Sequence, residues 1–285
     1  MDRKKFLSKA ALGTLSAVAA SSILKAETNE NQLFKQVGFN HLPNKEEKTM
    51  KTVLHKAETR GHANHGWLDS HHTFSFANYY NPERVQFGAL RVLNDDVVAP
   101  ARGFGTHPHD NMEIISIPLS GDLKHKDSMG NEAVIKEGDV QVMSAGTGIF
   151  HSEFNKNEDK EVRFLQIWLF PRERNVEPRY DQISIRDVEK KNAFYQVLSP
   201  NNDDEGVWVH QDAWFHLGNF DNDTSDEYTI KKQGNGVYAF VLEGEAEING
   251  QKLGKRDGLG IMEADKVNFK ATSDAKVLLM EVPMV

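Results

Sequence analysis

The stretch Gly103-Phe-Gly-Thr-His-Pro-His-Asp-Asn-Met-Glu113 contains the pair His107-x-His109, and a second pair, His151-x-Glu153, follows further along the chain. Both pairs lie in segments that read as β-strand, where side chains two residues apart project to the same face. Each pair therefore offers two donors to one point. A single histidine on a strand is usually a surface residue or a hydrogen-bonded core residue. Two matched pairs of such residues instead predict a metal centre.

The predicted ligands, His107, His109, His151 and Glu153, suit a divalent transition metal. The set is rich in nitrogen and lacks sulfur, which disfavours Cu(I) and iron–sulfur clusters and fits Fe(II), Mn, Ni, Cu(II) or Zn. Four protein ligands on a metal that accepts five or six leave room for substrate or oxygen. We therefore predict a reactive centre, with a closed zinc site that staples strands as the structural alternative.

The composition is that of a soluble, globular protein. The 285 residues are 39% hydrophobic and 27% charged, which is enough chain for two ordinary domains, each with its own core. The formal charge of -8 argues against a nucleic-acid surface, because phosphate binding requires a basic patch and the lysines here alternate with acidic residues. The chain has no cysteine, which excludes disulfides and a thiolate nucleophile.

Residues 1–26 have the pattern of an export signal. The basic start Arg3-Lys4-Lys5 precedes an apolar, small-residue run, Ala10–Leu24, which contains Ala17-Val18-Ala19 as a processing site. The start resembles a twin-arginine signal with Lys in place of the second Arg. The run is shorter than the roughly 20 apolar residues of a membrane span, so we expect an exported, periplasmic protein without a stable membrane anchor. Residues 27–51 are polar and aperiodic, and are predicted to be a linker.

From about Thr52 onward the chain reads as β-strand. Runs of β-branched and aromatic residues are separated by glycine, asparagine, aspartate and proline, and no long segment has a helical period. The dipeptide Asn249-Gly250 favours a tight hairpin. Many short strands with close turns predict an all-β sandwich or barrel. The predicted strands of the first half are Phe87–Val98, Met112–Leu119, Val134–Met143 and Val162–Phe170.

An internal echo indicates two such barrels. The segment Ile114–Asp122 is matched by Val237–Glu245, and both read as a hydrophobic strand followed by glycine and an acidic residue. The two glycines, Gly121 and Gly244, lie about one domain length apart. The sequence therefore predicts two tandem domains of the same kind.

The domains are predicted at residues 52–174 and 175–285, with the crossover at Pro171–Tyr180, a segment rich in proline and mixed charge. The histidines are concentrated in the first of them, and none follows His216. We therefore predict that the metal site belongs to the first domain and that the second domain holds no metal.

These segments resemble a known family. Gly103–Glu113, continuing to Leu119-Ser-Gly121, is similar to the first cupin motif, and Gly138–Asn155 is similar to the second. The sequence Gly146-Thr147-Gly148 before His151 resembles the motif of pirins rather than that of cupins in general. Further pirin-like segments extend the resemblance over residues 52–174, namely His65–Leu68, Thr73–Phe76 and His125–Asn131.

The pirin resemblance implies a bicupin, in which two tandem cupin domains form jelly-roll-like β-barrels. It implies one mononuclear metal, usually iron as Fe(II), at His107, His109, His151 and Glu153, with Mn, Ni, Cu or Zn as alternatives. Bacterial pirins of this type resemble quercetin dioxygenases, which open the central ring of a flavonol with O2 and release carbon monoxide. Vertebrate pirins instead resemble iron-dependent partners of transcription factors.

Two functional hypotheses follow. In the first, the chain is a quercetin dioxygenase, an oxidoreductase whose partners are a small flavonol or enediol and O2. A metal would lower the pKa of the flavonol 3-hydroxyl, and Glu153 is the candidate catalytic base. In the second, the chain is a metal-dependent binding or redox-sensing protein without turnover, whose protein partner is unknown. An export signal weakens a transcriptional role for it and leaves other partners open.

Glu113 is a further candidate at this centre. It lies an even number of residues from His109, and cupins outside this family use that position as a ligand. Because the pirin resemblance assigns the fourth ligand to Glu153, we predict that Glu113 holds a ligand imidazole or the substrate hydroxyl.

Three other groups of residues are given structural interpretations. The cluster His62, His65, His71 and His72 is irregularly spaced, so we predict a loop with polar tips at the mouth of the pocket rather than a second metal site. Lys124–Asp127 is predicted to be a solvated hairpin face. Three aromatic residues are predicted to line the core or the pocket wall, namely Trp67, Phe74 and Phe76.

Overall fold

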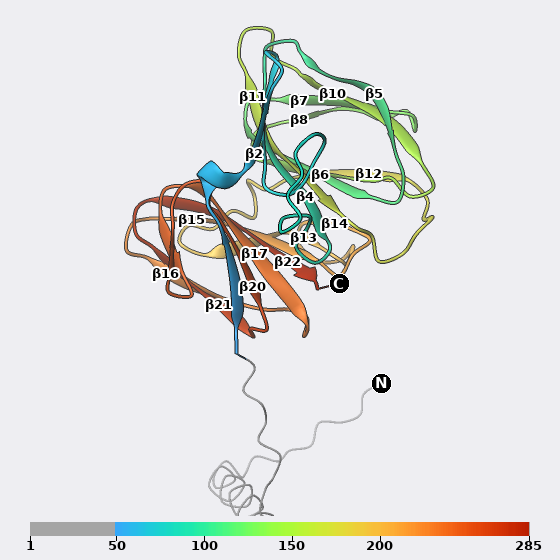
Figure 1. Ribbon diagram of the computed structural model, residues 1–285. Coiled ribbons are helices and arrows are strands. Elements are labelled where there is room, and N and C mark those ends of the chain that lie inside the picture. The colour runs from blue at the N-terminus through green and yellow to red at the C-terminus, as the bar shows by residue number, and fades with distance from the viewer. Residues whose placement is uncertain (1–48, 285) are drawn as a thin grey trace, which may run out of the picture. The chain divides into compact units, whose positions relative to one another are not determined.

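The computed structural model describes residues 49–284, which form two β-barrels (Figure 1). Apart from the short 3-10 helix η1 (Ala57–Thr59), every regular element of this part of the chain is a strand, which confirms the all-β prediction. No helix within 49–284 is long and apolar enough to cross a membrane. The predicted export signal at 1–26 and nearly all of the predicted linker at 27–51 lie outside the described residues.

The first barrel consists of two sheets. Its larger sheet has the spatial order β12 (Arg179–Ser184), β9 (Asp139–Ser144), β6 (Glu113–Ser120), β11 (Val162–Leu169), β4 (Leu90–Val98), β3 (Leu68–His72) and β2 (Gly61–Asn64). Its smaller sheet has the order β5 (Gly103–His109), β10 (Ile149–Asn155), β7 (Leu123–Asp127) and β8 (Glu132–Ile135). Three predicted strands thus agree with β4, β6 and β11, whereas the fourth, Val134–Met143, is divided by a turn between β8 and β9.

The second barrel repeats this layout. Its larger sheet has the order β1 (Lys51–His55), β20 (Gly258–Met262), β17 (Asn235–Glu243), β22 (Ala275–Pro283), β15 (Trp214–Phe220), β13 (Phe194–Ser199) and β14 (Val207–Trp208). Its smaller sheet has the order β16 (Ser225–Thr229), β21 (Lys266–Ala271), β18 (Ala246–Ile248) and β19 (Gln251–Leu253). The hairpin predicted at Asn249-Gly250 joins β18 to β19.

The internal echo of the sequence occupies equivalent places in the two barrels. Strand β6 lies between β9 and β11, and β17 lies between β20 and β22. The glycines that follow them, Gly121 and Gly244, have nearly equal φ angles of 74° and 75°. A Cβ at either position would also meet a backbone carbonyl oxygen, of Glu161 and Asp274 respectively, so both turns require glycine. The predicted pair of tandem cupin barrels is confirmed.

Two strands pair across the domain boundaries that the sequence suggested. Strand β1 precedes the first barrel in the chain but pairs with β20 of the second, from Lys51 opposite Met262 to His55 opposite Gly258. In Figure 1 this strand, in blue, runs along the second barrel. Strand β12 begins inside the predicted crossover Pro171–Tyr180, continues beyond it, and still pairs with β9 of the first barrel. The chain therefore passes to the second barrel after β12, and β1 ties the two barrels together.

The largest apolar cluster lies between the two seven-stranded sheets. It joins Ile115 and Leu165 of the first barrel to Phe215, Phe240 and Leu278 of the second, all of them buried. The central strands are therefore covered on both faces, as in β17, where every residue before Glu243 is buried. This explains why these strands read as continuous hydrophobic runs, whereas β21 alternates strictly between exposed and buried positions.

The interiors of the two barrels differ in chemistry. The second is filled by a single apolar cluster that includes Phe220, Val241 and Phe269. The first has two smaller clusters, around Phe164 and around Met143. Many of its other buried side chains are polar, among them Asn94, Asp96, Ser116, His125, His151, Glu153 and Gln166. A barrel that buries so many polar groups is built around a site.

Candidate metal centre

Strands β5 and β10 bring three predicted ligands together. His107 lies directly opposite His151 in the β5–β10 pairing, and His109 lies two residues along the same strand. The ring centroids are 4.4 Å apart for His107 and His151, and 4.9 Å apart for His109 and His151. One ring nitrogen from each of the three lies within 4.8 Å of the others. The alternation of strand side chains is what places three imidazoles at one point.

Glu153 lies on the same face of β10 as His151 and is buried. The register between β10 and β5 shifts between His151 and Glu153, so that Glu153 lies opposite Phe104. Ser116 Oγ donates a hydrogen bond of 3.0 Å to Glu153 Oε1, and Gln166 Nε2 donates one of 2.8 Å to Oε2. A carboxylate oxygen of Glu153 groups with nitrogens of His151 and His125 within 4.8 Å, and not with the three-histidine group. Glu153 as fourth ligand stays a prediction.

His125 and Asp127 also belong to this region, and sequence reasoning missed them. The prediction that Lys124–Asp127 is a solvated face is wrong, because His125 and Asp127 of β7 point inward while Lys126 is exposed. The His125 ring lies 5.4 Å from that of His151, and its Nε2 donates to Asp127 Oδ2 at 3.2 Å. The alternation of basic residues with Leu123, His125 and Asp127 was the signal that could have revealed the inward face.

The three imidazoles fit a divalent metal. Both ring nitrogens of His151 are buried without a hydrogen-bond partner, and an unsatisfied buried polar atom costs about 1–3 kcal/mol. Burial, then His107 and His125, lowers the pKa of His151 to about 3, and burial, then His151 and His107, lowers the pKa of His109 to about 4. Both rings are therefore neutral at pH 7, the form that coordinates metal. His107 Nδ1 donates to the Gly105 carbonyl at 2.8 Å, which leaves its Nε2 lone pair free.

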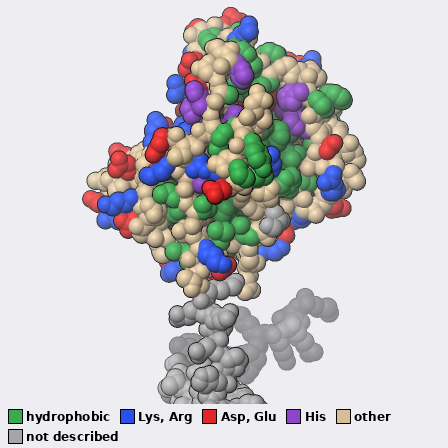
Figure 2. Space-filling view, viewed as in Figure 1, with side chains coloured by type: hydrophobic (Ala, Val, Ile, Leu, Met, Phe, Trp, Pro, Cys, Tyr) green, Lys and Arg blue, Asp and Glu red, His purple; other side chains and the backbone are tan. Residues whose placement is uncertain are grey.

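A cavity of about 420 Å³ opens beside the imidazoles, which is within the size range of small-molecule sites. Its apolar walls include Phe76, Phe104, Ile114 and Trp168. The Trp168 ring packs edge-on against His109, with centroids 4.9 Å apart. In Figure 2 histidine side chains, in purple, reach the surface over the first barrel. The arrangement gives a metal-binding corner with room for a flat, largely apolar molecule.

Some residues that line the cavity hold buried polar atoms without a partner in the described structure. Asn94 Oδ1, His72 Nδ1 and Trp168 Nε1 are buried without a hydrogen bond, and all three residues line the cavity. Asp96 lies beside them and accepts a hydrogen bond from Ser70 Oγ. Burial, assisted by Asp95 and Glu153, raises the pKa of Asp96 to about 7. The cavity wall therefore combines apolar surface with polar side chains.

Glu113 lies away from the cavity. Its Oε2 accepts hydrogen bonds from Ser144 Oγ at 2.8 Å and from the backbone N–H of His210 at 3.2 Å. Burial raises the pKa of Glu113. The prediction that it holds a ligand imidazole or the substrate is wrong, because β5 ends at His109 and a new strand begins at Glu113. Counting residues across that break does not preserve the face, and Ile114 lines the cavity instead.

The histidine cluster predicted as a loop lies on paired strands. His62 is in β2, His71 and His72 are in β3, and His65 lies in the turn that joins them. His62, His65 and His72 line the cavity, whereas His71 does not. The predicted position at the pocket mouth is thus correct for part of the cluster, but the predicted loop is wrong.

The second barrel has no counterpart to the metal centre among residues 49–284. Every group of three metal-capable side chains found there lies in the first barrel. The buried Glu281 of the second barrel is fully satisfied, with Tyr228 Oη at 2.6 Å and Asn235 Nδ2 at 2.9 Å among its donors.

Two tandem cupin barrels, with a cluster of imidazoles inside the first, define a bicupin with a candidate metal centre in its first barrel. Comparison with known proteins identifies the family. Residues 52–169 match the family model described as pirin, and residues 196–282 match the quercetinase C-terminal cupin domain. The chain belongs to the pirin family.

The match with this chain extends over nearly the whole length of several similar proteins. The quercetin 2,3-dioxygenase of Escherichia coli is 45% identical over 232 residues, which are 81% of this chain and 99% of the relative. A pirin-like protein of Caulobacter vibrioides is 37% identical over 78% of this chain and 95% of its own length. The crystal structure of the E. coli pirin YhhW in complex with nickel(II) is 44% identical, with a TM-score of 0.78 over 82% of this chain and 100% of that chain.

Proposed function

We propose that the chain is a metal-dependent dioxygenase that opens a flavonol, or a related enediol, with O2. The observation that carries the proposal is the meeting of three imidazoles beside one largely apolar cavity, with the buried Glu153 carboxylate close to one of them, His151. The comparisons support it, because the E. coli relative that matches over nearly its full length is named quercetin 2,3-dioxygenase.

The proposed ligands of one divalent ion are His107, His109, His151 and Glu153. We propose Fe(II) as the working ion, with Ni(II) as the first alternative, because the related YhhW has been crystallised with nickel(II). When bound, such an ion would lower the pKa of a substrate hydroxyl and orient the resulting anion.

Glu153 is the proposed proton acceptor for the substrate 3-hydroxyl. An ionised carboxylate only accepts hydrogen bonds, and Ser116 and Gln166 donate to its two oxygens at 3.0 and 2.8 Å. These two donors fix the orientation of the carboxylate before substrate arrives. A base that is already in place takes the proton without an additional rearrangement.

The cavity walls supply the proposed selectivity. Phe76, Ile114 and Trp168 offer apolar surface that excludes water and packs against a flat ring system. Asn94 Oδ1 accepts a hydrogen bond from a ring hydroxyl, and Trp168 Nε1 donates one to a ring oxygen, so that both gain a partner they lack. A polyhydroxylated aromatic substrate is therefore preferred over a purely apolar one.

Oxygen uptake tests the proposal. Protein loaded separately with Fe(II) and with Ni(II) is supplied with quercetin, and both O2 consumption and carbon monoxide release are followed. We expect turnover with at least one metal, and its loss by at least 100-fold in Glu153→Gln, about the lower end of a general base's contribution. Metal-loaded protein that binds quercetin but consumes no O2 would reject the dioxygenase proposal in favour of the binding or sensing function.

We also propose that the protein acts after export, on the evidence of the sequence pattern in residues 1–26. Production of the full chain with a C-terminal tag, followed by cell fractionation, tests this. We expect a shortened protein in the periplasm. A full-length protein confined to the cytoplasm contradicts it.

A further inference from the structure

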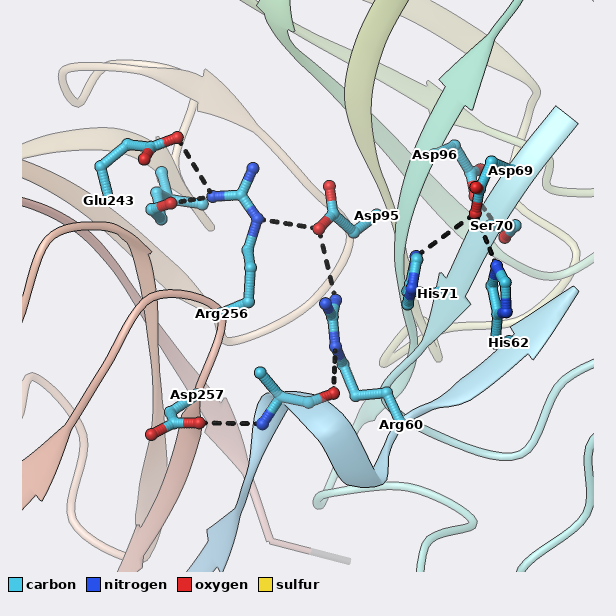
Figure 3. A network of polar contacts seen from close by, with 12 residues as sticks. Arg60, His62, Asp69, Ser70, His71, Asp95, Asp96, Glu243, Arg256 and Asp257 are labelled. Carbon is cyan, nitrogen blue, oxygen red and sulfur yellow. Dashed lines mark hydrogen bonds and ion pairs between the residues drawn. The ribbon is translucent and has the colours of Figure 1, made fainter. Parts of the chain in front are cut away.

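Strands β2 and β3 carry a second group of metal-capable side chains. His62 of β2 lies directly opposite His71 of β3, and Asp69 lies two residues before His71 on the same face. The two imidazole rings are stacked, with centroids 4.5 Å apart and planes inclined by 21°. Figure 3 shows both histidines directed at Asp69. β2 is the edge strand of its sheet, so the group is open to one side.

The three donor atoms are already spaced for one ion. His62 Nε2 lies 2.8 Å from Asp69 Oδ1, and His71 Nδ1 lies 3.6 Å from the same oxygen. All three donors lie within 4.8 Å of one another. Ligands about 2.0 Å from a tetrahedral ion are about 3.3 Å apart, so small side-chain rotations suffice to bind one.

This group is separate from the cavity centre. Along β3, Ser70 and His72 are buried and line the cavity, while Asp69 and His71 project from the opposite face. His62 is the one member of the group that also lines the cavity. The side chains of His62, Asp69 and His71 are 51%, 41% and 38% exposed, so an ion reaches them directly from solvent. No member of the group is among the proposed ligands of the first centre.

The surroundings orient the ligand set. Asn64 Nδ2 donates to Asp69 Oδ2 at 3.3 Å and holds the carboxylate. Burial, then Arg60 and His62, lowers the pKa of His71. Arg60 itself pairs with Asp95 at 3.3 Å, which compensates its charge (Figure 3).

We propose that His62, Asp69 and His71 form a second, surface site for a divalent cation of the zinc, nickel or copper(II) class. Two imidazoles and one carboxylate are the donors these borderline ions prefer, and water completes the coordination. Calcium and magnesium prefer all-oxygen coordination shells, so this pair of imidazoles disfavours them. The site goes beyond the proposed dioxygenase function and does not depend on it.

An ion at this site cross-links the edge strand β2 to β3. Since His62 and Ala63 of β2 and Ser70 of β3 line the cavity, the ion stiffens one wall of the substrate pocket. Zinc should therefore slow amide hydrogen exchange in β2, where the strand has a partner on one side only.

Equilibrium dialysis of the whole protein against buffered Zn²⁺, with metal counted by elemental analysis, tests the proposal. We expect two ions per wild-type chain and one in His71→Asn, whose surface site weakens by at least about tenfold. We expect one ion in His151→Asn, which retains the surface site, and none in the double variant. Retention of the cavity ion in His71→Asn shows that this variant is folded.

His65→Asn is the matched control, because it removes a histidine of the same hairpin that is not one of the three donors. It should bind two ions. A wild-type count that His71→Asn does not lower, or an unchanged affinity of both ions in His71→Asn, overturns the proposal. The difference between wild type and His71→Asn does not involve turnover or the cavity ion, so failure of the dioxygenase proposal would leave it unchanged.

Discussion

The two hydrogen bonds that hold Glu153 lead to a quantitative prediction. Replacing Gln166 by methionine removes the 2.8 Å donor while keeping a side chain of similar volume, and Ser116→Ala removes the 3.0 Å donor. A hydrogen bond to a charged group contributes about 1.5–3 kcal/mol. If that energy holds the base in its reactive orientation, each substitution should lower kcat/KM by about 10- to 150-fold.

The assay is steady-state oxygen consumption with quercetin, on protein whose metal content is measured for each variant. The control is Gln141→Met, which replaces another buried glutamine whose Nε2 has no partner and which makes no described hydrogen bond to Glu153. It should keep wild-type kcat/KM. If Gln166→Met holds its metal and stays within about twofold of the wild type, the reasoning that Glu153 is a positioned base is refuted.

Three further predictions concern stability. Because buried His151 and His109 resist protonation, the metal-free protein should lose stability as the pH falls from 6.5 toward 4. The free energy of unfolding, measured with urea, should fall less steeply with pH in His151→Asn than in the wild type. Equal slopes of unfolding free energy against pH contradict this. Burial raises the pKa of Asp96 from 3.8 to about 7, so the folded state loses stability relative to the unfolded state as the pH rises from 3.8 to about 7, where only the unfolded chain ionises. Asp96→Asn should therefore stabilise the metal-free protein at pH 8, by up to about 4 kcal/mol. A variant that is less stable than the wild type at this pH argues against a raised pKa of Asp96. Gly244→Ala should lower the free energy of unfolding by about 2–5 kcal/mol in thermal unfolding, since a Cβ meets the Asp274 carbonyl. Gly250→Ala, at a similar φ but with open space around the position, should lower it by only about 1–2 kcal/mol. Equal losses of stability would remove the steric argument.

The sequence was most informative where a short-range period decides the outcome. Strand alternation placed His107 and His109 on one face and His151 on the face of Glu153 without knowledge of distant partners, and the cupin resemblance joined the two pairs into one centre. The echo between the segments that became β6 and β17 predicted a second barrel for the same reason, since both copies keep the glycine that ends the strand.

The sequence was less informative where pairing is long-range. β1 joins β20, a strand about 200 residues away, and nothing within Lys51–His55 specifies that partner. His125 and Asp127 were misjudged because polar residues occupy both faces of β7, so polarity alone did not distinguish inside from outside. Glu113 was misplaced because counting by two fails when the chain turns between strands.

The metal centre inside the first barrel is the central claim, and an anomalous difference map from crystals of the metal-loaded protein tests it most directly. The account predicts a strong peak about 2.0–2.2 Å from ring nitrogens of His107, His109 and His151 and from a carboxylate oxygen of Glu153. A peak confined to the surface of the barrel, or none near these three imidazoles, would contradict it.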